Sequence, residues 1–104
     1  LYRTIMKKYA PTANAGDPLH VYGMAAAWTA AEGLKRAGKD LTREKFLAAM
    51  ATIKDYNEEG LVPGITFGPD RHHGLNAVRL MRAGKATDAA PNQITPWQTF
   101  APLF

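Results

Sequence analysis

A proline-capped start and a glycine stop frame one long helix near the beginning of the chain. The Asp17 carboxylate can accept hydrogen bonds from the free N–H groups of a first helical turn, and Pro18 suits the next position because it has no N–H. At the other end, Gly38 can adopt the positive φ with which many helices end. The spacing therefore predicts a helix from Asp17 to about Ala37.

A second helix is predicted shortly after this stop. Thr42 is a favourable N-cap residue, and Glu44 lies in the first turn, where a negative charge complements the helix dipole. Phe46, Met50 and Ile53 are spaced as one face of a helix. We expect this helix to end near Ile53 and to pack against the long one.

The long helix has a broad apolar stripe and an unusually small opposite side. The stripe consists of Val21, Met24, Ala27, Trp28, Ala31 and Leu34. The opposite side carries Ala26, Thr29 and Gly33 instead of the charged residues typical of a surface helix. We therefore expect close contacts on both sides of this helix, as in a helix between a sheet and a neighbouring helix.

Shorter elements flank the two helices. Residues 1–9 have the pattern of a helix end, which Pro11 stops. Residues 65–67 form a short β-type run, and residues 76–82 alternate as in a strand with one face more buried than the other. The pattern predicts two to three helices followed by a few short strands.

The last part of the chain, residues 86–104, contains three prolines and shows no clear period. It nevertheless carries several large apolar residues, namely Ile94, Trp97, Phe100, Leu103 and Phe104. A free tail seldom carries so many of them. We therefore expect the tail to pack on the rest of the protein or on a neighbour.

Composition excludes several classes of protein. The chain has no cysteine, which excludes disulfides and thiolate metal sites. The net charge is +4, but the 13 lysines and arginines are scattered, several of them near predicted helix C-termini, so no nucleic-acid partner is expected. No apolar run approaches the about 20 residues of a membrane span. Because a helical pattern is already present at Leu1, we expect a piece of a longer protein, with any export signal upstream.

No group of residues has the pattern of a catalytic or metal site. The chain lacks serine as well as cysteine, the commonest nucleophiles. Glu58 and Glu59 lie in a polar turn without a second catalytic group. The neighbouring His72 and His73 point to opposite sides of an extended segment and therefore do not chelate one ion together. The sequence thus predicts no enzyme, no metal and no cofactor.

Three residues at the start of the long helix are the candidate binding residues: Leu19, His20 and Tyr22. A helix N-terminus is electropositive and offers free N–H groups, so it can face a carboxylate ligand. The alternative is that His20 and Tyr22 only pack at the start of a buried helix. The residues themselves leave both interpretations open.

The sequence from Tyr22 to Lys45 resembles the C-terminal part of type I periplasmic solute-binding proteins, in the branch that serves branched-chain amino acid-type ABC transporters. The likeness lies in the Tyr-Gly and Ala-Ala helix start, the Leu-Lys-Arg-Ala-Gly end and the Asp-Leu-Thr-Arg-Glu that follows. Residues 60–67 and 69–74 resemble later segments of the same family, in the same order. Met24-Ala25 departs from the usual Tyr-Asp, and the tail from Pro91 is not a general feature of the family.

The resemblance implies an α/β fold with two doubly wound lobes that close on a small solute. Residues 1–90 would be the C-terminal portion of a lobe, and residues 91–104 a tail. The resemblance implies the substrate-binding component of an ABC importer in the periplasm, exported by an upstream signal peptide. Its partners would be an amino acid or a related carboxylate, aromatic acids included, and a membrane permease. One ligand contact would map near Leu19 and His20.

Two alternatives to the importer component remain. One is a stand-alone helical interaction module that binds an acidic partner, and the other is a ligand-sensing domain of the same fold. Because a piece of a longer protein would leave apolar surface exposed, we also expect the chain to self-associate or to bury its tail on a neighbour.

Overall fold

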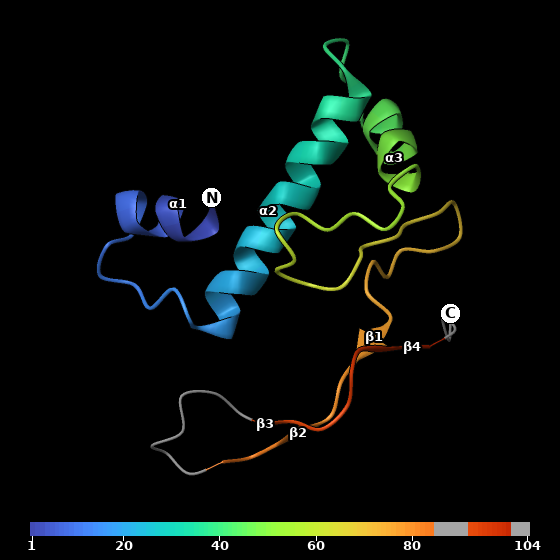
Figure 1. Ribbon diagram of the computed structural model, residues 1–104. Coiled ribbons are helices and arrows are strands. Elements are labelled where there is room, and N and C mark those ends of the chain that lie inside the picture. The colour runs from blue at the N-terminus through green and yellow to red at the C-terminus, as the bar shows by residue number, and fades with distance from the viewer. Residues whose placement is uncertain (85–91, 101–104) are drawn as a thin grey trace.

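The computed structural model describes residues 1–84 and 92–100. Three helices come first and four short strands follow (Figure 1). The helices are α1 (Tyr2–Tyr9), α2 (Pro18–Ala37) and α3 (Arg43–Ala51), and the strands are β1 (Ala77–Val78), β2 (Met81–Arg82), β3 (Asn92–Gln93) and β4 (Gln98–Thr99). This order confirms the expectation of helices followed by short strands.

The ends of α2 and α3 are those predicted from their caps. The Asp17 side chain accepts a hydrogen bond from the Leu19 N–H at 2.8 Å, and Gly38 ends α2 with a φ of 80°. The Thr42 hydroxyl accepts from the Lys45 N–H at 3.2 Å and so caps α3. Helix α3 ends at Ala51, shortly before its predicted end near Ile53.

The small side of α2 packs against α3, which runs back alongside it (Figure 1). Ala25, Thr29 and Gly33 are its buried residues, and the Thr29 hydroxyl is satisfied because it donates to the Ala25 carbonyl at 2.7 Å. A Cβ atom on Gly33 would lie 2.3 Å from Met50 Sδ and 3.0 Å from Phe46 Cε2. The predicted close contact on the small side is therefore confirmed at Gly33, whereas Ala26 on the same side is exposed.

The apolar stripe on the other side of α2 is less covered than expected. Ala27, Ala31 and Leu34 are exposed, and Trp28 is half-buried. The stripe therefore has no tightly packed neighbour in the described part of the chain, and the expected contact on this side is not found there.

Arg36 ties the last turn of α2 to the end of α3. Its Nε donates to Glu32 Oε1 at 2.7 Å, and its Nη1 donates to the Thr52 carbonyl at 2.9 Å. A cation at this carbonyl satisfies one of the acceptors that a helix end leaves without an intrahelical partner. The contact adds a polar clamp to the apolar packing at Gly33.

The segment after α3 folds back over the helices around Ile53, which is fully buried. Tyr56 and Ile65 exchange two backbone hydrogen bonds of 2.9 and 2.8 Å and close a loop of residues 56–65. The Phe67 N–H then donates to the Ile53 carbonyl at 3.0 Å, and the Thr66 N–H to the Gly74 carbonyl at 2.9 Å. The β-type run predicted at residues 65–67 thus forms separate bridges instead of a regular strand.

Loop 56–65 also holds α1. The two oxygens of the Glu59 carboxylate accept hydrogen bonds from the Leu1 nitrogen at 2.7 Å and from the Tyr2 N–H at 3.0 Å. The Tyr2 hydroxyl donates to the Ala15 carbonyl at 2.9 Å, and Tyr2 and Met6 are buried. The hydrogen bonds from the Leu1 nitrogen and from the Tyr2 N–H lower the pKa of Glu59 below its ordinary 4.5.

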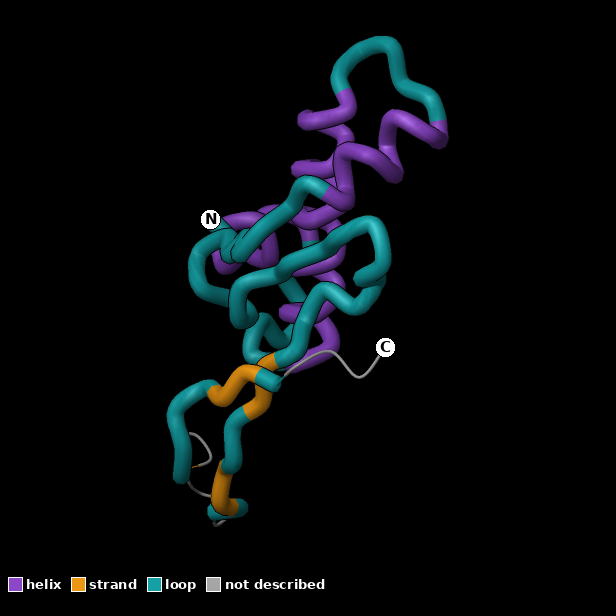
Figure 2. Tube along the Cα trace, turned by 90° about the vertical axis from the view of Figure 1, so that its right-hand side faces the viewer, coloured by secondary structure: helices purple, strands orange, loops and turns teal. Residues whose placement is uncertain are grey.

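The strands form an antiparallel ribbon, defined here as residues 76–82 and 92–100. β1 pairs with β4 and β2 pairs with β3, and the Leu80 carbonyl between the two pairs accepts from the Ile94 N–H at 2.9 Å. Figures 1 and 2 show that this ribbon extends away from the helices.

The expectation of a strand with one buried face at residues 76–82 is wrong, because every residue from Val78 to Arg82 is exposed. The ribbon leaves the body of the chain, so neither of its faces meets the helices. The predicted packing of the tail stays a prediction, and Leu103, Phe104 and residues 86–91 lie outside the described residues.

The contact at Gly33 predicts different outcomes for the same substitution at two glycines of α2. We expect Gly33→Val to lower the free energy of unfolding by about 1–3 kcal/mol more than Gly23→Val, because the new side chain meets Met50 and Phe46. An added Cβ at Gly23 has nothing within 4 Å, so this variant carries only the helix-propensity change. Urea unfolding followed by circular dichroism measures both, and equal midpoints would contradict the packing described.

The hydrogen bonds of Glu59 predict a pH dependence for the attachment of α1. Because the folded state lowers the pKa of this carboxyl, its stabilising contribution is present above pH 4.5 and is lost as the pH falls through the lowered value. We expect the protection of the Tyr2 and Ile5 amides, taken as their hydrogen exchange relative to the intrinsic rate at each pH, to fall on acidification, and Glu59→Gln to remove this dependence. Glu44→Gln on α3 is the control and should keep it; a wild-type-like profile in Glu59→Gln would contradict the assignment.

Candidate functional site

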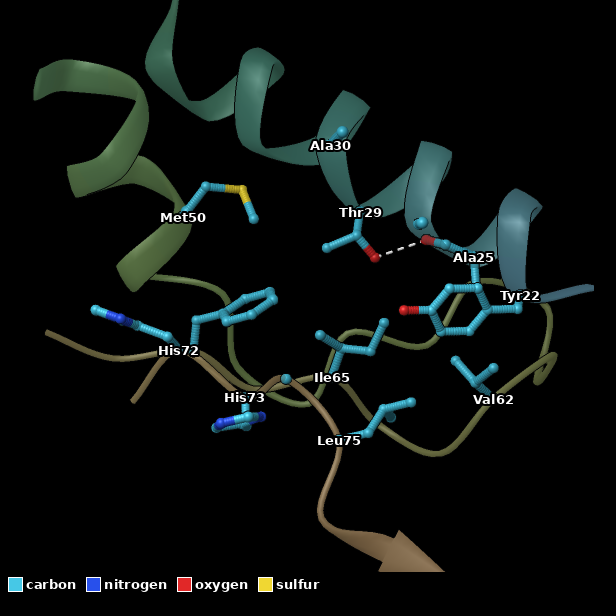
Figure 3. A pocket seen from close by; sticks show the side chains of 13 residues that line it. Tyr22, Ala25, Thr29, Ala30, Met50, Val62, Ile65, His72, His73 and Leu75 are labelled. Carbon is cyan, nitrogen blue, oxygen red and sulfur yellow. Dashed lines mark hydrogen bonds between the residues drawn. The ribbon is translucent and has the colours of Figure 1, made fainter. Parts of the chain in front are cut away.

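A hollow of about 480 Å³ lies between α2 and the segment that crosses it (Figure 3). One wall is formed by five residues of α2, namely Tyr22, Ala25, Ala26, Thr29 and Ala30. Met50 of α3 closes one end, and the facing wall consists of Val62, Ile65, Phe67, His72, His73, Gly74 and Leu75. The lining is mostly apolar, as is usual for small-molecule sites.

Two features of the sequence give the hollow its shape. The alanines on α2 have no side-chain atoms beyond Cβ, so the hollow extends close to the backbone of this helix. On the facing side, a Cβ on Gly74 would lie 2.9 Å from both Ile65 Cγ2 and Phe67 Cζ. Glycine at this position therefore lets residues 72–75 lie directly against residues 65–67.

Tyr22 carries the polar group that is best placed to meet a ligand. Its ring stands at the side of the hollow with the hydroxyl turned toward the centre (Figure 3), and 67% of its surface is exposed. The Thr29 hydroxyl also faces the hollow, but it is engaged with the Ala25 carbonyl. A ligand here would meet apolar walls and one phenol.

The structure places the other two candidate residues outside the hollow. Leu19 is 79% exposed and does not line it. His20 is turned to the preceding loop, where its Nδ1 lies 2.9 Å from the Asn14 carbonyl oxygen. The Leu19 N–H, one of the donors expected to face a carboxylate, is taken by Asp17. Of the three candidates, Tyr22 alone therefore meets the hollow.

The two histidines line the rim, but their rings point away from the centre (Figure 3). His72 Nε2 lies 3.3 Å from the Pro69 carbonyl oxygen. Within residues 1–84 and 92–100, no three His, Asp or Glu side chains gather closely enough to hold a metal ion. The hollow therefore offers a ligand an apolar surface with hydrogen-bonding side chains at its edge.

The facing wall is the part of the site that the sequence did not reveal. Val62, Ile65, Phe67 and Leu75 were predicted at most as parts of a short strand, without any link to α2. A weak signal existed, since these apolar residues are separated by Gly64, Gly68 and Gly74. Glycines at such intervals allow a chain to approach its own side chains closely.

Tyr56, beneath this wall, has a raised pKa. Its partial burial is the larger cause, and the hydrogen bond from its hydroxyl to Glu58 Oε2, at 3.1 Å, adds to it. The phenol therefore stays protonated and acts as a fixed donor inside loop 56–65.

Comparison with known proteins assigns the chain to a family. A family model described as periplasmic binding protein matches residues 2–88, which include the three helices, the hollow and the first two strands. No curated protein and no solved structure matches the chain significantly. No helix among the described residues is long and apolar enough to cross a membrane. The match confirms the resemblance and the α/β fold class: the chain belongs to the periplasmic binding protein family.

Proposed function

We propose that this chain is part of the substrate-binding component of an ABC importer, which takes up an amino acid or a related carboxylate, aromatic acids included. The observation that carries the proposal is the family match over residues 2–88, which supports a solute-binding role. Binding works by closure of two lobes around the solute, as in hinge-closing receptors. The family implies a periplasmic or exported location, and the closed form delivers the solute to a membrane permease.

The proposal gives the two parts of the chain different tasks. Residues 1–90 form the C-terminal portion of a solute-binding lobe, with the α2–α3 pair as its scaffold. The tail, residues 91–104, packs on the rest of the protein or on a neighbour. Exposed apolar side chains on the helices, such as Leu34 and Leu47, support self-association of the isolated chain.

The ligand-contacting residues in this proposal are Tyr22, at the hollow, and Leu19 and His20, at the start of α2 outside it. All three lie in the first two turns of α2 and are exposed to solvent. Tyr22 contributes a ring and a hydroxyl at the side of an apolar hollow, which suits a solute with an apolar or aromatic side chain. No catalytic step is proposed, because the sequence has neither a serine nor a cysteine nucleophile.

A thermal-shift screen of the full-length protein tests this function. L-amino acids and aromatic carboxylates are added one at a time, and the true solute at 100 times its Kd is expected to stabilise the protein by about 2.7 kcal/mol. This stabilisation raises Tm by several degrees. A screen in which no member of either class raises Tm would overturn the proposed solute class.

Two tyrosine variants then test the site. We expect Tyr22→Ala to weaken binding of that solute about tenfold, because it loses the ring and the hydroxyl at the hollow. Tyr9→Ala is the matched control, since Tyr9 lies on α1, is 73% exposed and does not line the hollow. Isothermal titration measures both, and equal affinities for the two variants would remove Tyr22 from the site.

A further inference from the structure

The two ends of loop 56–65 meet at a contact between Asp55 and Gly64. A Cβ atom added at Gly64 would overlap Oδ1 of Asp55 and would lie 2.8 Å from its Cγ and 3.2 Å from its Cα. Gly64 is half-buried and is not among the residues with a positive φ, so its backbone conformation does not require glycine. Glycine is needed here because the Asp55 side chain fills the space in which a Cβ atom would lie.

Hydrogen bonds hold Asp55 in its place. Its N–H donates to the Thr66 hydroxyl at 2.9 Å, and the next residue, Tyr56, exchanges backbone hydrogen bonds of 2.9 and 2.8 Å with Ile65. The φ of Asp55 is 46°, in the left-handed region that aspartate, asparagine and glycine adopt more readily than other residues. Relief of a clash at position 64 therefore requires residue 64 to move, or one of these hydrogen bonds to break.

Gly64 lies between two residues of the facing wall of the hollow. Val62 comes two positions before it and Ile65 follows it directly, and both line the hollow. Ile65 is 7% exposed, and its Cγ2 atom would lie 2.9 Å from a Cβ atom at Gly74, so it is packed tightly against the next segment. This packing leaves Val62 as the wall residue that a shift at position 64 would displace.

We propose that the contact between Asp55 and Gly64 positions the facing wall of the hollow and thereby sets its affinity for solute. The inference rests on the solute-binding function proposed for the hollow and adds two positioning residues to it, neither of which lines the hollow. A binding site keeps its affinity only when its walls are held to within about 0.5 Å. The contact lies within one loop, so it does not depend on which outer surfaces the rest of the protein covers.

Solute binding by the full-length protein tests the proposal. The probe is the amino acid or aromatic carboxylate that gives the largest shift in the thermal-shift screen, and isothermal titration measures its Kd. We expect Gly64→Ala to weaken binding about tenfold, because the added Cβ atom displaces the wall. Asp55→Gly alone should stay within about threefold of wild type, because glycine retains the left-handed backbone conformation.

Two double variants and one control separate the contact from a general loss of stability. Gly64→Ala/Asp55→Gly removes the overlapping side chain and leaves a contact of 3.2 Å with Cα of residue 55, so the affinity should return to within about threefold of Asp55→Gly. Gly64→Ala/Asp55→Asn keeps a side chain of the same size and should remain about tenfold weaker than wild type. Thr42→Ala removes the N-cap of α3 and should lower the stability without changing the Kd.

Hydrogen exchange of the Tyr56 and Ile65 amides, measured without solute, follows the bridge that closes the loop. We expect Gly64→Ala to lower the protection of both amides, and the double variant with Asp55→Gly to regain it. An unchanged Kd in Gly64→Ala, or a loss that Asp55→Asn relieves as well as Asp55→Gly does, would overturn the proposal and leave the solute-binding function standing. A screen that finds no solute overturns that function, and the proposal with it.

Discussion

The close approach of α3 to Gly33 decides where the rest of the chain can lie. Because Met50 and Phe46 rest directly on the backbone of α2 at Gly33, α3 is held beside the C-terminal half of the long helix. Ile53 is then buried, and its carbonyl receives the Phe67 N–H. That hydrogen bond fixes the segment that faces Tyr22 across the hollow. A missing side chain on one helix thus determines the position of the far wall of the candidate site.

The elements that could be predicted are those with strong local signals. The helix ends depend on three residues, Asp17, Gly38 and Thr42. Each acts on backbone groups only a few residues away, so the helix ends can be predicted without knowing the fold. The small side of α2 could be predicted for a similar reason, since glycine and alanine leave room for a neighbour whatever that neighbour is. For the helix ends and for the small side of α2, local interactions were therefore sufficient for the prediction.

The hollow and the ribbon could not be predicted, because both depend on contacts between distant residues. The residues near Phe67 do not indicate its backbone hydrogen bond to Ile53. The residues near Val78 do not indicate that it pairs with Gln98 of another strand. The alternation at residues 76–82 was real, but alternation shows only that a strand has two sides and not that one of them is covered. For the candidate residues, the position of Tyr22 by the hollow agrees with its place on the helix, whereas the turning of His20 toward Asn14 depends on the loop before it.

Loop 56–65 has a consequence for how the candidate site and α1 influence each other. Its tip contributes Val62 to the hollow and, three positions earlier, Glu59 to the start of α1. The Tyr56–Ile65 bridge closes this loop, so Val62 and Glu59 belong to one short segment that is held at both ends. A ligand that moves Val62 relative to Glu59 would link occupancy of the hollow to the attachment of α1, and the coupling free energy would act equally in both directions. A change at α1 would in this way alter the affinity of the hollow for its ligand, although α1 does not line the hollow.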